Sequence, residues 1–229
     1  VILLRHLSNF TDFNVLERDE RVHLYYTNNV DDITKADIIL LPGSKNTLDD
    51  LYELRRNGVA QAILKASQEG ATVMGICGGY QMMGLEVRDP EGVEGNVRML
   101  PGLGLLPVIT TMQGDKVTRQ VEFTFDGTEA LCKGYEIHMG RTVPAEGSPP
   151  SPFNQLADGR EDGYQDKQKK CLGTYIHGIL DNQPFIDFLL APYIGKLGQQ
   201  TFDYTAFKEE QYDKLAEHVR KHINMPLLY

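Results

Sequence analysis

The chain has 229 residues, of which 41% are hydrophobic and 24% are charged, so it can bury a full core as a soluble globular protein. Its formal net charge of −9 argues against nucleic acid or an anionic membrane as a main partner, because both favour clustered Lys and Arg. Three scattered cysteines are too few for a disulfide framework or a zinc site, and no apolar run is long enough to cross a bilayer. With no signal or transit peptide pattern either, we expect a cytoplasmic protein.

Strands and helices alternate along the first third of the chain. This alternation predicts a doubly wound α/β fold, with a mainly parallel sheet and flanking helices in a flavodoxin-like arrangement. Ligands bind beyond the C-terminal ends of such strands, so we expect the loops 7–13, 42–47 and the turn after residue 76 to meet at one rim. The expected strands are 1–5, 21–27, 37–41 and 71–76, and the expected helices are 48–54 and 59–66.

A β-rich section forms the middle of the chain. Alternating residues predict strands over 105–111, 116–125 and 134–142, with a turn at 114–115 between the first two. The polar segment 145–170, rich in Gly, Pro, Ser and charge, is expected to be a surface excursion that is partly mobile.

After residue 170, the pattern of apolar residues predicts a strand over 171–177, a helix over 183–194 and a final amphipathic helix. The apolar positions of that last helix are Tyr204, Phe207, Leu215, Val219 and Ile223. We therefore divide the chain into a domain of residues 1–195 and a helical extension of residues 196–229. The extension is expected to pack on the same domain or on a neighbouring domain that this sequence lacks.

The ten residues 75–84 (Gly-Ile-Cys-Gly-Gly-Tyr-Gln-Met-Met-Gly) carry the strongest chemical signal. An apolar run leads into Cys77, glycines bracket it, and a helix-compatible stretch follows at once. This pattern predicts a nucleophile on a sharp strand-to-helix turn, where the helix N-terminus favours thiolate over thiol. The structural alternative is a buried cysteine in an ordinary turn, because free cysteine is often a small core residue.

A cysteine nucleophile needs a base, and His138 and His177 are the main candidates, since each follows a β-like stretch and precedes a glycine. The local pattern leaves the two nearly tied. His218 and His222 have metal-compatible spacing but no third ligand nearby, so we expect a solvated helix face there and no metal site.

The motif around Cys77 resembles the nucleophile motif of class I glutamine amidotransferases. Its pairing with residues 175–178 (Tyr-Ile-His-Gly) is similar to the cobyric acid synthase branch of that superfamily, as are the stretches 8–13, 41–47 and 134–142. The resemblance extends to about residue 194. It implies a C-terminal glutaminase domain without its N-terminal ATP-binding synthetase domain, and the apolar opening also looks like part of a longer polypeptide.

The resemblance decides between the two histidines. It implies that Cys77 attacks the glutamine amide to form a glutamyl thioester and that His177 serves as its base. The oxyanion would be stabilised by the backbone N–H of Gly78 and by a second N–H from Gly43 or Ser44.

One feature departs from the family pattern. Ordinary class I enzymes carry an acid two residues after the histidine, and that position is Ile179 here. His177 must therefore be oriented by another group or work in a dyad. The candidate acids are Asp12, Glu136 and Asp181.

The implied reaction is the hydrolysis of L-glutamine to glutamate and ammonia, with the ammonia used to amidate corrinoid side-chain carboxylates in cobalamin biosynthesis. ATP and Mg²⁺ are implied for the synthetase domain, whereas no cofactor is expected here, since the sequence has no Gly-x-x-x-x-Gly-Lys-Ser/Thr loop. Gln81 would line the glutamine pocket or be an ordinary helix residue. His138 and Arg141 would lie near the domain interface or the corrinoid, or else form a structural turn.

Two other functions stay open at this point. The chain could be the glutaminase of a related amidating complex, either cobyrinic acid a,c-diamide synthase or one that amidates a cell-wall precursor. It could also be a structural or regulatory module with an inert cysteine.

Overall fold

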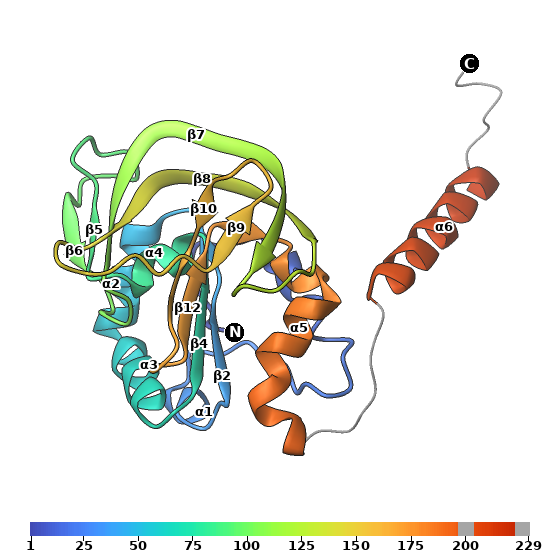
Figure 1. Cartoon of the computed structure of the whole chain (residues 1–229), viewed down its shortest axis with the longest axis horizontal. Helices are drawn as coiled ribbons and strands as arrows, with labels where there is room; N and C mark the ends of the chain where they lie inside the picture. The colour runs from blue at the N-terminus through green and yellow to red at the C-terminus, as the bar shows by residue number, and fades with distance from the viewer. Residues whose placement is uncertain (197–203, 223–229) are drawn as a thin grey trace.

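The computed structural model describes residues 1–196 and 204–222, and a four-stranded sheet lies at its centre (Figure 1). Three of its strands run parallel, and the fourth, at one edge, is antiparallel. The expected mainly parallel sheet is therefore confirmed. In spatial order the strands are β11 (Tyr164–Asp166), β12 (Cys171–Thr174), β4 (Thr72–Ile76) and β2 (Ile38–Leu41).

Helices cover both faces of this sheet, with α3 and α5 on opposite sides in Figure 1. Alternate residues of a strand point to opposite faces, so Ile39 and Leu41 join the core beneath α2 and α3, while Leu40 joins the core that contains α5. The helices are α1 (Val30–Ile33), α2 (Thr47–Arg56), α3 (Val59–Gln68), α4 (Gly78–Met83), α5 (Gln183–Leu190) and α6 (Tyr204–His222).

A second, largely antiparallel sheet is built on two long strands, β7 (Val108–Phe125) and β8 (Cys132–Pro144), which arch over the central sheet (Figure 1). The turn expected at 114–115 is wrong, because β7 continues through it with a shift in register between Thr111 and Lys116. Shorter strands complete the sheet: β5 (Glu86–Arg88), β6 (Met99–Pro101), β9 (Asn154–Leu156), β10 (Glu161–Asp162) and β13 (Ile176–His177).

The first two expected strands are largely irregular. The segment at the N-terminus lies beside β2, since the Ile2 N–H donates to the Leu40 carbonyl at 2.9 Å, but its only bridge to the segment 21–27 joins Ile2 and Thr27. A different pair of short strands forms at the rim, where β1 (Leu7–Ser8) runs antiparallel to β3 (Gly43–Ser44).

Two further expectations need correction. The segment 145–170 contains the short strands β9, β10 and β11, and β11 is the edge strand of the central sheet, so part of this segment is paired into the two sheets. The helix expected over 183–194 ends at Leu190 and continues as the 3₁₀ helix Ala191–Lys196.

The expected C-terminal helix is present as α6, and its contacts with the domain are few. Leu215 and Val219 are exposed, whereas the Phe207 ring lies 5.5 Å below the Arg18 guanidinium carbon. Ile223, which the sequence places on the same stripe, lies outside the described residues. No helix in the described part of the chain combines the length and apolarity that a membrane crossing requires.

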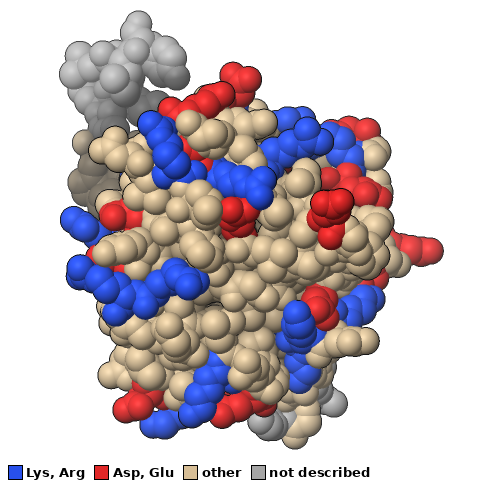
Figure 2. Space-filling model, turned by 90° about the vertical axis from the view of Figure 1, so that its left-hand side faces the viewer, with Lys and Arg blue, Asp and Glu red and all other residues tan. Residues whose placement is uncertain are grey.

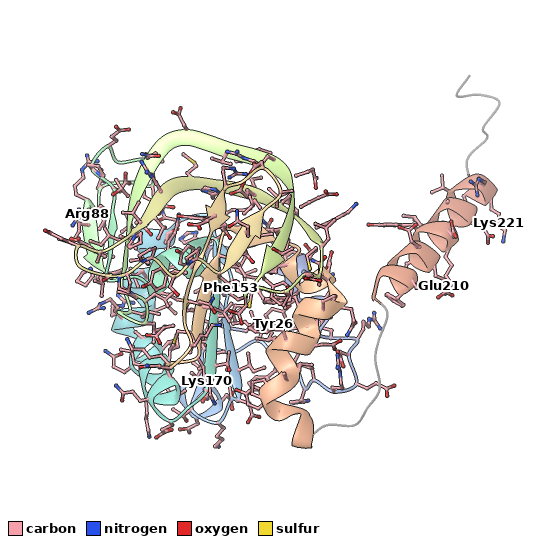
Figure 3. The ribbon with its side chains drawn as sticks, in the orientation of Figure 1. Tyr26, Arg88, Phe153, Lys170, Glu210 and Lys221 are labelled. Carbon is pink, nitrogen blue, oxygen red and sulfur yellow. The ribbon has the colours of Figure 1, made fainter. Side chains whose placement is uncertain are left out.

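Apolar side chains lie mainly in the interior, and charged side chains lie mainly at the surface. In Figure 3, Phe153 lies in the interior, while Arg88, Lys170 and the α6 residues Glu210 and Lys221 lie on exposed positions. Figure 2 shows the face that carries α2, β5 and β6, where charges of both signs surround a band of uncharged surface.

Candidate active site

Cys77 occupies a strained turn between β4 and α4. Its φ of 53° and ψ of −111° lie outside the regions that ordinary residues populate. The bracketing glycines allow this turn, because a Cβ on Gly79 would lie 2.0 Å from the Leu41 carbonyl oxygen and one on Gly75 would lie 2.6 Å from the Tyr80 nitrogen. The predicted strand-to-helix elbow is confirmed.

The Cys77 thiol is held as a thiol in the free protein. Burial raises its pKa to about 12, and although the Gly78 N–H facing the sulfur lowers the pKa, Asp12 and Glu94 raise it further. The Sγ atom faces the Ile137 carbonyl of β8 at 3.6 Å. The first N–H of α4 favours the thiolate, as expected, but burial outweighs it in this state and keeps the group a thiol.

Neighbouring parallel strands bring His177 to the same rim as Cys77. Thr174 of β12 is in register with Ile76 of β4, and the Cys77 N–H donates to the Thr174 carbonyl at 2.8 Å. His177 follows three residues later and is 1% exposed. Its ring stacks on Tyr135 of β8 with centroids 5.3 Å apart.

Asp12 is the acid that orients His177. Its Oδ2 lies 2.7 Å from Nδ1, and its Oδ1 accepts the Gly178 N–H at 3.1 Å. A carboxylate on Nδ1 fixes the proton there, so Nε2 is the acceptor. The Asn9 amide nitrogen lies close to both ring nitrogens, 3.1 Å from Nδ1 and 3.2 Å from Nε2. Asp12 thus provides the carboxylate that Ile179 cannot provide.

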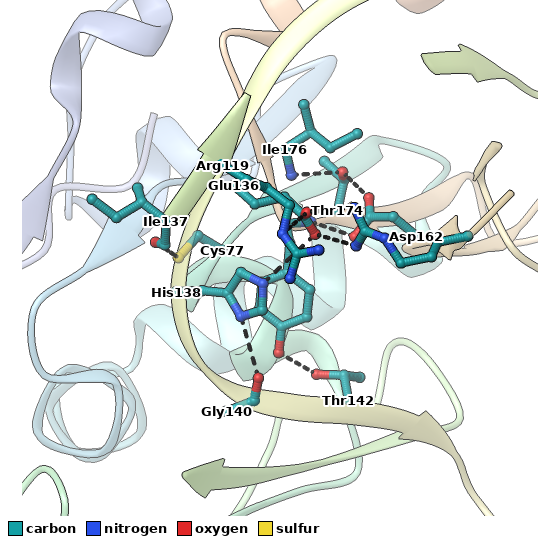
Figure 4. A network of polar contacts seen from close by, with 12 residues as sticks. Cys77, Arg119, Glu136, Ile137, His138, Gly140, Thr142, Asp162, Thr174 and Ile176 are labelled. Atoms are coloured by element: carbon teal, nitrogen blue, oxygen red, sulfur yellow. Dashed lines mark hydrogen bonds and ion pairs between the residues drawn. The ribbon is translucent and has the colours of Figure 1, made fainter. Parts of the chain in front are cut away.

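The other two candidate acids have different surroundings. Glu136 pairs with Arg119 at 3.2 Å (Figure 4) and with Arg160 at 3.0 Å. Burial alone would raise the pKa of Glu136, but hydrogen bonds from His138 and Arg160 outweigh it and lower that pKa. Asp181 lies in the 3₁₀ helix after His177 and lines a separate surface cavity.

The rim loop at 43–44 packs between the histidine and the elbow. The Lys45 N–H donates to the His6 carbonyl across β1, and successive amides of a strand point in opposite directions, so the Ser44 N–H points away from β1. Ser44 N lies 2.8 Å from the position of a Cβ on Gly78. A Cβ on Gly43 would instead lie 3.3 Å from His177 Cε1.

Gln81 lines the cavity beside Cys77, but its polar atoms are already bonded within the protein. Its Oε1 accepts from Thr47 Oγ1 at 2.9 Å, and its Nε2 donates to the Met139 carbonyl at 2.9 Å and to Tyr175 Oη at 3.2 Å. Gln81 therefore ties α4 to α2 and β8, which makes it a wall of the cavity.

The cavity beside Cys77 has a volume of about 450 Å³. Three charged side chains at its lining, Lys45, Glu94 and Lys116, come from different elements. Nothing in the sequence pattern assigns them a role, because they are far apart along the chain. Asn9 and Tyr135, which contact His177, were also missed, although both lie in stretches that resemble the family.

His138 and Arg141 both belong to β8, but only His138 lines the cavity beside Cys77. The His138 ring stacks on Tyr175 with centroids 3.8 Å apart, and its Nδ1 donates to the Gly140 carbonyl at 3.2 Å. His138 lines the Cys77 cavity and also a second cavity, whose lining includes Arg141. His138 is thus part of the wall between the two.

An α/β sheet with an elbow cysteine and a histidine just beyond the end of the adjacent strand is the architecture of class I glutamine amidotransferases. Solved structures share this fold: that of one glutamine amidotransferase has a TM-score of 0.60 at 16% identity over 83% of this chain and 96% of its own. The structure of PurLQS from Thermotoga maritima has a TM-score of 0.53 at 17% identity, covering 77% of this chain and 84% of its own.

This chain belongs to the CobB/CobQ-like glutamine amidotransferase domain family, whose match covers residues 1–185. Among its relatives, cobyric acid synthases from Phocaeicola vulgatus and Bacteroides fragilis are 73% and 70% identical over all of this chain. That of Syntrophobacter fumaroxidans is 42% identical over 98% of it. The chain spans 46% of the length of the first two and 47% of the third.

Proposed function

We propose that this chain is the glutamine-hydrolysing part of a cobyric acid synthase. In this proposal it releases ammonia from L-glutamine, and an N-terminal, ATP-dependent synthetase domain of the same polypeptide uses the ammonia to amidate corrinoid carboxylates. The names of the relatives support the corrinoid reaction, and their length supports a second domain. ATP and Mg²⁺ are assigned to that second domain, and none of the steps below requires a cofactor.

The observation that carries the proposal is the hydrogen bond between Asp12 and His177 at the rim where Cys77 sits. With Nδ1 protonated and bonded to Asp12, Nε2 is free to take the thiol proton when substrate displaces Asn9. The sulfur then attacks the amide carbon of glutamine and forms a tetrahedral oxyanion.

In the remaining steps His177 passes the thiol proton to the leaving group, and water supplies the proton that restores the thiol. The oxyanion collapses to a glutamyl thioester while the His177 imidazolium gives its proton to the departing amine, which leaves as ammonia. Water then adds to the thioester with His177 as base, and glutamate leaves as the thiol regains its proton. The N–H of Gly78 and that of Ser44 are the proposed oxyanion donors, because both border the space at the elbow.

The experiment is a comparison of glutamine and ammonia as nitrogen donors in the full-length protein with ATP, Mg²⁺ and corrinoid. We expect Cys77→Ser to abolish glutamate release and glutamine-dependent amidation, while amidation with added ammonium salt continues. Glutamate release that survives Cys77→Ser would contradict the proposal. A wild-type protein that uses only free ammonia would favour the inert module.

A further inference from the structure

Asp50 is a buried carboxylate that the proposed chemistry does not use. It lies in the first turn of α2 and is 1% exposed. Among the described residues, its neighbour Asp49 pairs with Arg5 and His6, whereas Asp50 has no Lys, Arg or His partner. A buried carboxylate is costly unless hydrogen-bond donors satisfy it, so the position of Asp50 depends on the donors that face it.

Two donors from separate segments of the chain meet on this carboxylate. Its Oδ1 accepts the His6 N–H at 3.0 Å, and its Oδ2 accepts the Ser44 hydroxyl at 2.6 Å. His6 immediately precedes β1 and Ser44 ends β3, so Asp50 ties both strands of this pair to α2. A carboxylate offers two acceptor oxygens and no donor, whereas an amide would place an NH₂ group against one of the two donors.

The Ser44 hydroxyl is held from both sides. Its Oγ accepts the Asn46 N–H at 3.0 Å while it donates its own hydrogen to Asp50. The preceding residue is Gly43, and glycine restricts the backbone little, so the peptide between Gly43 and Ser44 needs constraints from outside. That peptide carries the Ser44 N–H. The two bonds at Oγ therefore limit the directions in which this N–H can point.

The residue that is held in this way borders the nucleophile. Ser44 N lies 2.8 Å and Ser44 Cβ lies 3.0 Å from the position of a Cβ on Gly78, which directly follows Cys77. Helix α2 also lies beside α4, the helix that begins at the elbow (Figure 1), and Thr47 Oγ1 donates to Gln81 at 2.9 Å. The loop and the elbow are thus both fastened to α2, and Asp50 is the link on the side of the loop.

We infer that Asp50 is a positioning residue, which directs the Ser44 N–H towards the oxyanion of the tetrahedral intermediate by holding the Ser44 hydroxyl. This inference rests on the proposed glutaminase activity. Asp50 does not line the cavity beside Cys77, so it acts through Ser44. A donor directed at the oxyanion stabilises the transition state more than the bound substrate. Loss of that direction should therefore lower kcat and leave KM largely unchanged.

The test compares Asp50→Ala, Ser44→Ala and the double variant in the full-length protein. We expect each single variant to lower kcat for glutamine hydrolysis roughly 10- to 100-fold, with KM changed by less than about threefold. The double variant should stay within about threefold of the slower single variant, because both changes break the same hydrogen bond. Asp49→Asn is the matched control. Asp49 lies on the same turn but is bonded to His6 Nε2 and not to the loop, so kcat should stay within about twofold of wild type.

Alkylation of Cys77 by iodoacetamide separates this positioning role from a purely structural one. The reaction forms no oxyanion, but its rate depends on the burial that raises the thiol pKa. At a fixed pH, we expect the alkylation rate of every variant to stay within about twofold of wild type. If Asp50→Ala does not fold, Asp50→Asn takes its place. Its amide can accept from only one of the two donors, so kcat should still fall about threefold or more.

Four results would each overturn the inference: an unchanged kcat in the Asp50 and Ser44 variants, losses that multiply in the double variant, an equal loss in Asp49→Asn, or alkylation rates that change as much as kcat. The proposed function is judged separately, by whether wild-type protein hydrolyses glutamine and Cys77→Ser does not.

Discussion

Asp12 and His177 are 165 residues apart in the chain, and their side chains meet at 2.7 Å in the interior. The carboxylate comes from the 3₁₀ helix Phe10–Phe13 at the rim, and both side chains are almost fully buried. Ile179, at the position where related enzymes carry the acid, is completely buried and apolar. The carboxylate on Nδ1 of His177 therefore comes from a distant part of the sequence and not from position 179.

Asp12→Asn should reduce kcat for glutamine hydrolysis by roughly 10²- to 10⁴-fold. The asparagine oxygen can still accept the Gly178 N–H, but its NH₂ would face Nδ1 as a donor and favour the wrong tautomer of His177. Steady-state glutamate release measures the effect. Asp181→Asn is the control. An equal loss of kcat in that variant, or a loss under about threefold for Asp12→Asn, would indicate that Cys77 and His177 act as a dyad without Asp12.

Gly43→Ala should slow turnover without unfolding the domain. The new Cβ would lie 3.3 Å from His177 Cε1 and 3.0 Å from Ser8 Oγ, so the imidazole must shift by a few tenths of an ångström. We expect kcat to fall roughly 10-fold. Gly114→Ala, whose Cβ would have no atom within 4 Å, is the matched control. Identical kcat values for the two variants would show that the rim loop does not set the position of His177.

The reactivity of Cys77 towards iodoacetamide should rise steadily with pH. Because burial raises the thiol pKa to about 12, only a small fraction is thiolate near neutrality, and that fraction grows tenfold per pH unit. The alkylation rate of ligand-free protein should therefore climb without a plateau from about pH 7 to about pH 9.5. A plateau beginning below about pH 8 would indicate a resting thiolate–imidazolium pair instead.

Asp162→Asn should destabilise the fold by about 1–3 kcal/mol. The buried carboxylate accepts the Asn154 amide at 2.9 Å, the Thr174 hydroxyl at 2.5 Å and the Tyr175 N–H at 3.1 Å. An amide in its place turns one acceptor into a donor that faces other donors. Denaturant unfolding checks this, with Glu161→Gln on the exposed side of the same strand as control. Equal midpoints for the two variants would contradict this role.

The elbow could be predicted from the sequence because its determinants are local. Gly75 and Gly79 are required by contacts within a few residues of Cys77 or with the adjacent strand, and their spacing is visible in the chain. The central parallel strands could be predicted for the same reason, since each is an apolar run ended by a turn.

The partner of His177 could not be derived in this way. Asp12, Glu136 and Asp181 are equivalent as residue types, and only the pairing of β1 with β3 and of β12 with β4 decides which of them reaches the ring. The upward shift of the Cys77 pKa was missed because its main cause is burial of the thiol, which depends on packing between distant parts of the chain. The prediction of a turn at 114–115 was wrong because a Gly-Asp pair also fits an irregular point in a long strand.

The central claim is that Cys77 and His177 act together on glutamine, and covalent labelling with 6-diazo-5-oxo-L-norleucine tests it most directly. Mass spectrometry of the full-length protein should find one adduct, on the peptide that contains Cys77. Labelling should be absent in Cys77→Ala and at least roughly 100-fold slower in His177→Asn. An adduct on Cys132 or Cys171 instead, or a His177→Asn protein labelled at the wild-type rate, would contradict the account.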